Sequence, residues 1–506
     1  MHQGSWGGHG HQAQVQRTHC KAASKGLKAA MELKRLRGLS PLTARQLFTS
    51  MVAPVVDYAS NVWMHECNWK AAPAVNRVQR IGAQAIVGTF STVATSIAEA
   101  EAHIPTAQDR FWKRAIKMWT DIHTMPKTNP LRDVTSRMRK FRRSYRSPFY
   151  QVSDLLKDVP LESLETVDPF VLAPWEERVD TTVDETATAQ METGWAVRIA
   201  VSSSGRNNMV GMGGVVRIPL SMRGGPRDDT FKMTLGPRTE QNPYSAELAA
   251  VGHALRLVRK VRYRRIILAT SNKAAVLTLK NPRQQSGQQY VSEAYDAIQT
   301  ARDAGNTISV VWIPTSAEHE LLKIAKDKAR EATQQNATQQ AQEPGMRSTT
   351  LRVARAKRAA AKPLPEKVGR HSKRVDTALP GKHTRLLHDH LSRKEAGVLA
   401  QLRTGMAKLN TYLHRIRAAS SDQCACGQAR ETVEHFLFRC RQWTEHRAEM
   451  LQCTDIHRGN ISFYLGGRSP SDDKNWSPDM QAVRTTIRFA ISTGRLDADQ
   501  QQNGTA

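Results

Sequence analysis

The sequence predicts a multidomain protein: an all-α N-terminal block, a central α/β domain on a mixed five-stranded sheet, and a small helical, cysteine-rich C-terminal region. Three observations predict this division. Residues 21–123 carry apolar side chains at helical spacing, and residues 195–335 carry strand and helix signals in the order β-β-β-α-β-α-α-β-α. Three of the six cysteines fall within seventeen positions, 424–440.

The expected segments follow the composition of the chain. Helix signals dominate 21–123 and return after 385, while Gly, His and Gln dominate the start. We expect a disordered start (1–20), a helical block (21–123), a basic linker (124–190), the α/β domain (191–335), a disordered basic arm (336–385), a helical and metal-binding region (386–465) and a tail (466–506).

The helical block shows apolar residues at i, i+3 and i+4 spacing, for example Leu33, Leu36 and then Val75, Val78, Ile81. Ser40 followed by Pro41 is typical of a helix N-cap with proline in the first helical position. We therefore expect several amphipathic helices here.

The α/β domain begins with an expected hairpin, in which strands 195–201 and 211–218 flank a turn at 203–208. Later signals alternate between short apolar strands and longer helical patterns. We expect three further strands at 231–236, 264–270 and 308–314, and helices at 245–260, 272–280, 291–305 and 317–335.

The charge of the chain points to a polyanionic partner. The 506 residues include 74 Lys and Arg against 46 Asp and Glu, which gives a net charge of +28. This excess is typical of nucleic-acid-binding proteins, although a solvated basic surface is the alternative. No apolar run approaches the ~20 residues that span a bilayer, and six cysteines do not suggest a disulfide framework. We expect RNA, DNA or an RNA–DNA hybrid as partner, no membrane or small-molecule substrate, and an intracellular, nuclear location.

Two basic segments are candidate nucleic-acid contacts. The run RMRKFRRSYR (137–146) interleaves six cations with Phe141 and Tyr145, a pattern typical of phosphate contacts combined with base stacking. A solvated linker is the alternative interpretation. The candidate contacts, including three from the basic arm, are Arg137, Arg139, Lys140, Arg142, Arg143, Arg146, Arg355, Lys357 and Arg358.

The cysteine-rich end offers a metal site. Cys424, Cys426, His435 and Cys440 form a Cys₃His set suited to tetrahedral Zn²⁺. Gly427 permits a tight turn after the second cysteine. Buried cysteines in a small core are the alternative, because the one-residue gap between the first two cysteines is shorter than usual.

The helical block also carries a family resemblance. Leu36–Gly38, Pro54–Tyr58 and Trp63 together resemble the thumb-side segment of LINE-type (non-LTR) retrotransposon reverse transcriptases. Residues 195–335 are similar to the RNase H domain of those proteins, and 391–440 to their C-terminal zinc region, especially in fungal elements. The polymerase palm of the family is absent, so the resemblance implies the C-terminal part of a longer ancestral protein.

The resemblance also implies a metal site that this chain has lost. In the RNase H family, four acids hold two metal ions, and here the matching motifs contain Ser202, Glu247, Ser271 and Lys326, with Ser316 at a helper histidine position. Glu247 is the sole retained acid, and Asp327 is turned about 100° from Lys326 on a helix. We expect a degenerate domain that binds nucleic acid without cleaving it.

Two alternatives remain open. The first is an active RNA–DNA hybrid ribonuclease that uses Mg²⁺ and displaced acids such as Asp228, Asp229 or Asp303. The second is a protein-interaction scaffold.

Overall fold

The computed structural model describes residues 6–64, 73–137, 148–168, 170–184, 188, 191, 195–219, 227–339, 343–359, 364–473 and 475–497. The chain forms two compact units. The helical unit combines residues 1–114 with 361–506, and the sheet unit contains residues 115–360. The N-terminal helices and the C-terminal region, which we expected as separate domains, therefore share one unit.

The sheet unit is built on a mixed six-stranded sheet in the order β1-β6-β5-β2-β3-β4. Strands β2, β3 and β4 pair antiparallel, whereas β2, β5, β6 and β1 pair parallel. The strands are β1 (Asp180–Thr182), β2 (Val197–Arg206), β3 (Met209–Ile218), β4 (Arg227–Pro237), β5 (Arg265–Thr270) and β6 (Thr307–Trp312). The five predicted strands are present, but the predicted number was wrong. β1 lies in the expected linker, and three residues are too few to show an alternating pattern.

The β2–β3 hairpin is tighter than the sequence suggested. β2 continues to Arg206, which pairs with Met209, so the loop contains just Asn207 and Asn208. Both asparagines have positive φ, 49° and 61°, as a type I′ turn requires. The predicted turn at 203–208 was too long, because pairing with β3 keeps the serines of β2 in the sheet.

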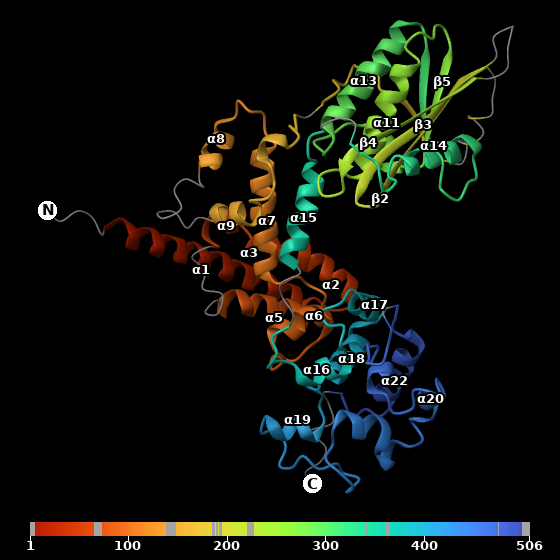
Figure 1. The fold of residues 1–506 in the computed structure, drawn as a ribbon. Helices are drawn as coiled ribbons and strands as arrows, with labels where there is room; N and C mark the ends of the chain where they lie inside the picture. The colour runs from red at the N-terminus through yellow and green to blue at the C-terminus, as the bar shows by residue number, and fades with distance from the viewer. Residues whose placement is uncertain are drawn as a thin grey trace. The chain divides into compact units, whose positions relative to one another are not determined.

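Both faces of the sheet are covered by helices, which are α11 (Pro243–Leu257), α12 (Lys273–Lys280), α13 (Gln288–Asp303) and α14 (Glu320–Glu331) (Figure 1). Val197, Ile199 and Val201 of β2 pack with α11 and α13, while Ala196 and Ala200 pack with α14 on the other face. Asn242 caps α11 by accepting a 3.0 Å hydrogen bond from the Ser245 N–H, with proline in the first turn.

The helical unit joins N-terminal and C-terminal helices. The Ser40 cap is confirmed, since its hydroxyl accepts a 3.2 Å hydrogen bond from the Thr43 N–H. The N-terminal helices are α1 (Trp6–Arg35), α2 (Pro41–Leu47), α3 (Ala53–Val56), α4 (Ser60–Trp63), α5 (Pro73–Val87), α6 (Thr95–Glu101) and the start of α7 (Ala107–His123). The C-terminal helices are α16 (Arg370–Val375), α17 (His383–Asp389), α18 (Arg393–Thr404), α19 (Asn410–Arg415), α20 (Ala448–Leu451), α21 (Ile461–Tyr464) and α22 (Met480–Ser492).

A buried ionic cluster connects these two sets of helices. Arg403 on α18 donates to Glu101 at the end of α6 and to Asp376 after α16, at 2.8 and 2.6 Å. His383 contacts the same Asp376 oxygen at 2.6 Å. Arg403, Glu101 and Asp376 have no exposed side-chain surface, so each charge depends on its partners.

Helices are present in the expected disordered start and in the expected tail. α1 begins at Trp6, inside the expected disordered start, since extending a helix already packed on α5 costs little. The expected tail contains α22, whose Val483, Ile487 and Ala490 are buried in the core.

The basic arm is also ordered where it is described. α15 (Arg347–Ala359) lies in the sheet unit, and α16 and α17 lie in the helical unit. The buried Glu165 carboxyl receives the Arg347 N–H at 2.6 Å and thereby caps α15 from outside the helix. This cap lies 182 residues away along the chain, so local composition could not reveal it.

None of the described helices combines the length and apolar character needed to cross a membrane.

Candidate functional site

Glu247 is a buried, hydrogen-bonded carboxyl rather than an open metal ligand. It lies near the N-terminus of α11 with 2% of its surface exposed. The Thr270 hydroxyl at the end of β5 donates to Oε1, and the hydroxyl and N–H of Ser203 donate to the same carboxyl. Burial raises the pKa of Glu247 to about 7, although these hydrogen bonds and the charge of Lys326 oppose the rise.

The serine beside Glu247 is Ser203, and Ser202 points to the opposite face of the sheet. Ser202 pairs with Gly213, where a Cβ atom would lie 2.3 Å from the Ala329 backbone nitrogen of α14. Paired residues in antiparallel strands share a face, so Ser202 faces α14 and Ser203 faces α11. Motif matching pointed to Ser202 and missed Ser203 and Thr270. Side chains two residues apart on a strand share a face, so the apolar Ile199 and Val201 could have indicated that Ser203 lies on the same face as they do.

The other positions at which the family motifs are not kept are Ser271, Lys326 and Ser316, and none of them supplies an acid. Ser271 is partly exposed, and its backbone carbonyl accepts a 3.2 Å hydrogen bond from Trp312 Nε1. Lys326 on α14 is near enough for its charge to lower the pKa of Glu247, and Ser316 is exposed between β6 and α14. The neighbouring Asp327 forms an exposed ion pair with Arg330 at 3.0 Å.

The alternative acids, Asp228, Asp229 and Asp303, form ion pairs or hydrogen bonds with residues other than Glu247. Both oxygens of Asp228 accept from Arg217 at 2.7 Å, and this guanidinium lowers the pKa of Asp228. Asp229 pairs with Arg227 at 2.9 Å, and Asp303 accepts a 2.8 Å hydrogen bond from Gln299. All three lie on β4 or at the end of α13, so they do not complete a set with Glu247. Across the described residues, no group of three or more potential ligands forms around Glu247.

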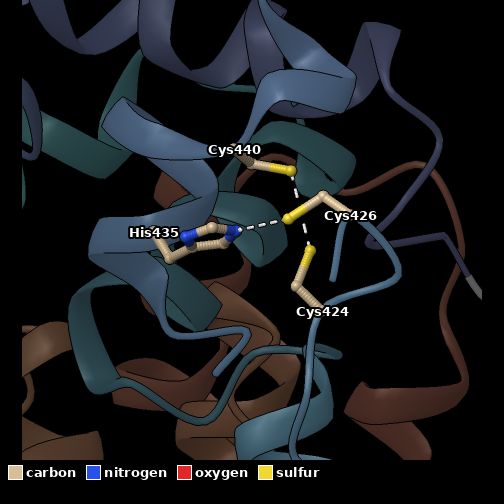
Figure 2. Close-up of side chains that lie close together, drawn as sticks. All are labelled: Cys424, Cys426, His435 and Cys440. Atoms are coloured by element: carbon tan, nitrogen blue, oxygen red, sulfur yellow. Dashed lines mark hydrogen bonds between the residues drawn. The ribbon is translucent and has the colours of Figure 1, made fainter. Parts of the chain in front are cut away.

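The Cys/His cluster is a geometrically complete metal-ligand set (Figure 2). The three sulfurs and the imidazole nitrogen of Cys424, Cys426, His435 and Cys440 all lie within 4.8 Å of one another. Cys424 Sγ is 3.6 Å from Cys440 Sγ, and Cys426 Sγ is 3.3 Å from His435 Nε2. A tetrahedron with Zn–S bonds of ~2.3 Å has edges of roughly 3.5–3.8 Å. The cluster can therefore hold a metal.

Local structure brings the four ligands together. Gly427 has φ 73° and donates to the Cys424 carbonyl at 3.0 Å, which confirms the predicted turn. A short π-helical turn, His435–Arg439, ends at Cys440, whose N–H donates to the His435 carbonyl at 2.8 Å. The backbone N–H of Gln428 lowers the pKa of the Cys426 thiol, which favours the thiolate that metals bind. Cys453 instead contacts the Thr485 hydroxyl at 3.1 Å.

The predicted nucleic-acid contacts divide into two groups. The side chains of Arg137, Arg139, Lys140, Arg142, Arg143 and Arg146 lie outside the described residues. The other three lie on α15, where Arg355 is exposed, Lys357 pairs with Asp158 at 3.2 Å, and Arg358 is half-buried.

Part of the sheet unit is similar to a known protein family. Residues 200–327 match a family model described as reverse transcriptase-like. No curated protein sequence matches the chain.

Three solved structures match the same share of the chain, 27%, each with a TM-score of 0.22. They are RNase H1 from the halophilic archaeon Halobacterium salinarum (18% identity, 96% of its chain covered), the N-terminal RNase H domain of a Mycobacterium tuberculosis protein (15%, 100%) and LC11-RNase H1 in complex with RNA/DNA hybrid (13%, 99%). These likenesses assign no role to individual residues. Residues 200–327 are thus similar to a reverse transcriptase-like domain, over the stretch where the sequence resembles an RNase H domain.

Proposed function

We propose that this chain is a nucleic-acid-binding protein whose RNase H-like domain does not cleave. The observation that carries this proposal is the surroundings of Glu247. The carboxyl is 2% exposed, bonded to Thr270 and Ser203, and close to the charge of Lys326.

These surroundings do not suit two-metal hydrolysis. That reaction needs acidic ligands that hold two divalent ions on either side of the scissile phosphate. Burial raises the pKa of Glu247 to about 7, so a substantial share of this carboxyl is protonated near neutral pH, and the nearby charge of Lys326 would repel a metal ion. Asp228 and Asp229 are already paired with arginines.

Nucleic-acid binding is supported by charge and by similarity. The net charge of +28 favours phosphate contacts, which are sequence-tolerant and weaken as salt is raised. One of the matching solved structures is described in complex with an RNA/DNA hybrid. We propose RNA, DNA or their hybrid as the partner, and a nuclear location.

The reverse transcriptase-like match at residues 200–327 also supports an origin in a LINE-type retrotransposon, which we propose to be fungal.

We further propose that Cys424, Cys426, His435 and Cys440 hold a structural Zn²⁺. Four protein ligands fill a tetrahedral site, which is typical of structural rather than catalytic zinc. When bound, the ion would cross-link the turn at Gly427 to the segment after His435. Elemental analysis of the purified chain should find one zinc per molecule, and an equal signal in Cys424→Ser/His435→Ala would contradict the site.

The proposal that the RNase H-like domain does not cleave is tested with a labelled RNA–DNA hybrid and Mg²⁺ or Mn²⁺. We expect retention of the hybrid in a binding assay and no cleavage. Metal-dependent cleavage that Glu247→Gln abolishes would instead establish an active ribonuclease. Failure to retain hybrid, RNA or DNA at moderate salt would favour a protein-interaction scaffold.

A further inference from the structure

A further basic surface, outside both segments considered above, lies at the end of the sheet opposite Glu247. Residues 256–265 (RLVRKVRYRR) contain six cations and no acid, between the end of α11 and the start of β5. Glu247 lies near the first residue of α11, and Thr270 is the last residue of β5, so both lie at the opposite ends of these elements from residues 256–265. Because β5 rises ~3.3 Å per residue, Arg265 and Thr270 lie roughly 16 Å apart. We name residues 256–265 the basic loop.

The cations of the basic loop are available to a partner. Arg256 pairs with Glu293 at 3.0 Å, but Arg259, Lys260, Arg262, Arg264 and Arg265 form no ion pair within the described residues. All five are exposed. Five like charges within seven positions repel one another, so an anion that neutralised them would be favoured.

Hydrogen bonds hold the basic loop in one conformation. The buried Asn306 side chain accepts from the Arg264 N–H and donates to the Val261 carbonyl, each at 2.9 Å. The Thr307 N–H donates to the Arg264 carbonyl at 3.0 Å. Pre-ordering of the loop lowers the entropy cost of binding a partner.

Tyr263 is an exposed aromatic residue at the centre of the basic loop. It is 84% exposed and has a φ of 50°, a left-handed conformation that is costly for a residue with a large side chain. Its ring lies over Gly305, where a Cβ atom would be 2.5 Å from Tyr263 Cδ1. Glycine therefore leaves room for the ring, and the exposed remainder is open to solvent.

We infer that the basic loop binds single-stranded nucleic acid, with one base stacked on Tyr263 and the neighbouring phosphates contacting Arg259, Lys260 and Arg262. Cations beside an exposed aromatic ring are the arrangement by which proteins bind single strands without sequence preference. This inference rests on the proposed nucleic-acid binding and assigns a surface to it, away from the degenerate site.

Fluorescence anisotropy of the full chain with labelled single strands of roughly 20 nucleotides, DNA and RNA, tests the inference. The strand is longer than the ~4–16 nucleotides that one such site covers. We expect Arg259→Ser/Lys260→Ser to weaken binding and to reduce the slope of log K against log salt by about 1.4, the share of two phosphate contacts. Lys280→Ser/Arg283→Ser removes two exposed charges from the same unit and should leave the slope nearly unchanged.

Variants of Tyr263 separate stacking from charge. Tyr263→Gly also suits the positive φ, so the loop keeps its conformation, and we expect the Kd to rise roughly 5- to 150-fold with an unchanged salt slope. Tyr263→Phe keeps the ring and should bind like the parent chain.

Equal behaviour of the basic-loop and control variants would overturn this inference while leaving nucleic-acid binding intact. No binding by the parent chain would overturn both proposals. A loop-dependent binding to phosphatidylserine vesicles, with single strands unaffected, would replace nucleic acid by a membrane surface and overturn the inference.

Discussion

Arg403 Nε donates a hydrogen bond to Glu101 Oε2 at 2.8 Å, and neither side chain has any exposed surface. These residues are 302 positions apart and belong to the two segments that make up the helical unit. Burial by itself would raise the pKa of Glu101, but Arg403 and His388 hold it below its ordinary value. The ion pair therefore connects the first and last parts of the chain.

Loss of Arg403 should destabilise the helical unit. Arg403→Met leaves the Glu101 and Asp376 carboxylates buried without their arginine, so we expect a loss of about 3–5 kcal/mol in the free energy of unfolding. Urea denaturation followed by circular dichroism measures it. Arg458 forms an exposed pair with Asp455, and Arg458→Ala should change stability by less than about 0.5 kcal/mol. Equal effects of the two substitutions would contradict a structural role for the cluster.

Glu247 should make stability fall as the pH rises. Its pKa is raised from 4.5 unfolded to about 7 folded, so the native state holds the proton more tightly between these values. The favourable contribution is fully present below about pH 4.5 and is lost as the pH rises through about 7. At pH 8 Glu247→Gln should be more stable than the parent by on the order of 2–3 kcal/mol.

The comparison of parent and Glu247→Gln at pH 5 and pH 8 isolates this group from Glu99, whose pKa burial also raises to about 7. A stability difference that does not change with pH would show that Glu247 is charged in the folded chain.

Removal of metal should unfold the region around the Cys/His cluster. Chelation leaves three thiols and an imidazole close together without the ion that holds them, so we expect a lower unfolding temperature, restored by Zn²⁺. Cys424→Ser should lose the effect of the chelator, and Cys453→Ser should keep it because Cys453 contacts Thr485. Insensitivity of the parent chain to chelation would argue for a metal-free core.

Glu165 should keep α15 helical. Its carboxyl accepts from the Ser286 hydroxyl and from the N–H groups of Gly287 and Arg347, the last two at 2.7 and 2.6 Å. Glu165→Ala leaves the buried Ser286 and Gly287 donors and the half-buried Arg347 N–H without this acceptor, at a cost of about 1–3 kcal/mol for each buried donor. Hydrogen exchange should show protected α15 amides in the parent chain and faster exchange in the variant. Fast exchange in the parent would restore the expectation of a disordered arm.

Motif matching predicted some of the residues around Glu247 and missed others. Glu247, which the motif gives as the retained acid, lies buried near this end of the sheet, and the charge of Lys326 acts on it. It chose the wrong serine because one residue along a strand reverses the face. Thr270 was missed because its contact with Glu247 depends on how β5 packs beside α11.

The sequence by itself determined the features whose causes are local. Periodicity revealed the strands and helices of the α/β domain, Ser40 and Pro41 marked a helix start, and the spacing of Cys424, Cys426, His435 and Cys440 predicted a ligand set formed within seventeen residues. Tertiary structure decided the rest because partners distant in sequence made those contacts. Glu101 meets Arg403, Glu165 caps α15, and β1 is a strand because β6 lies beside it. Energies of such long-range contacts are absent from any local pattern, since they arise when folding buries both partners together.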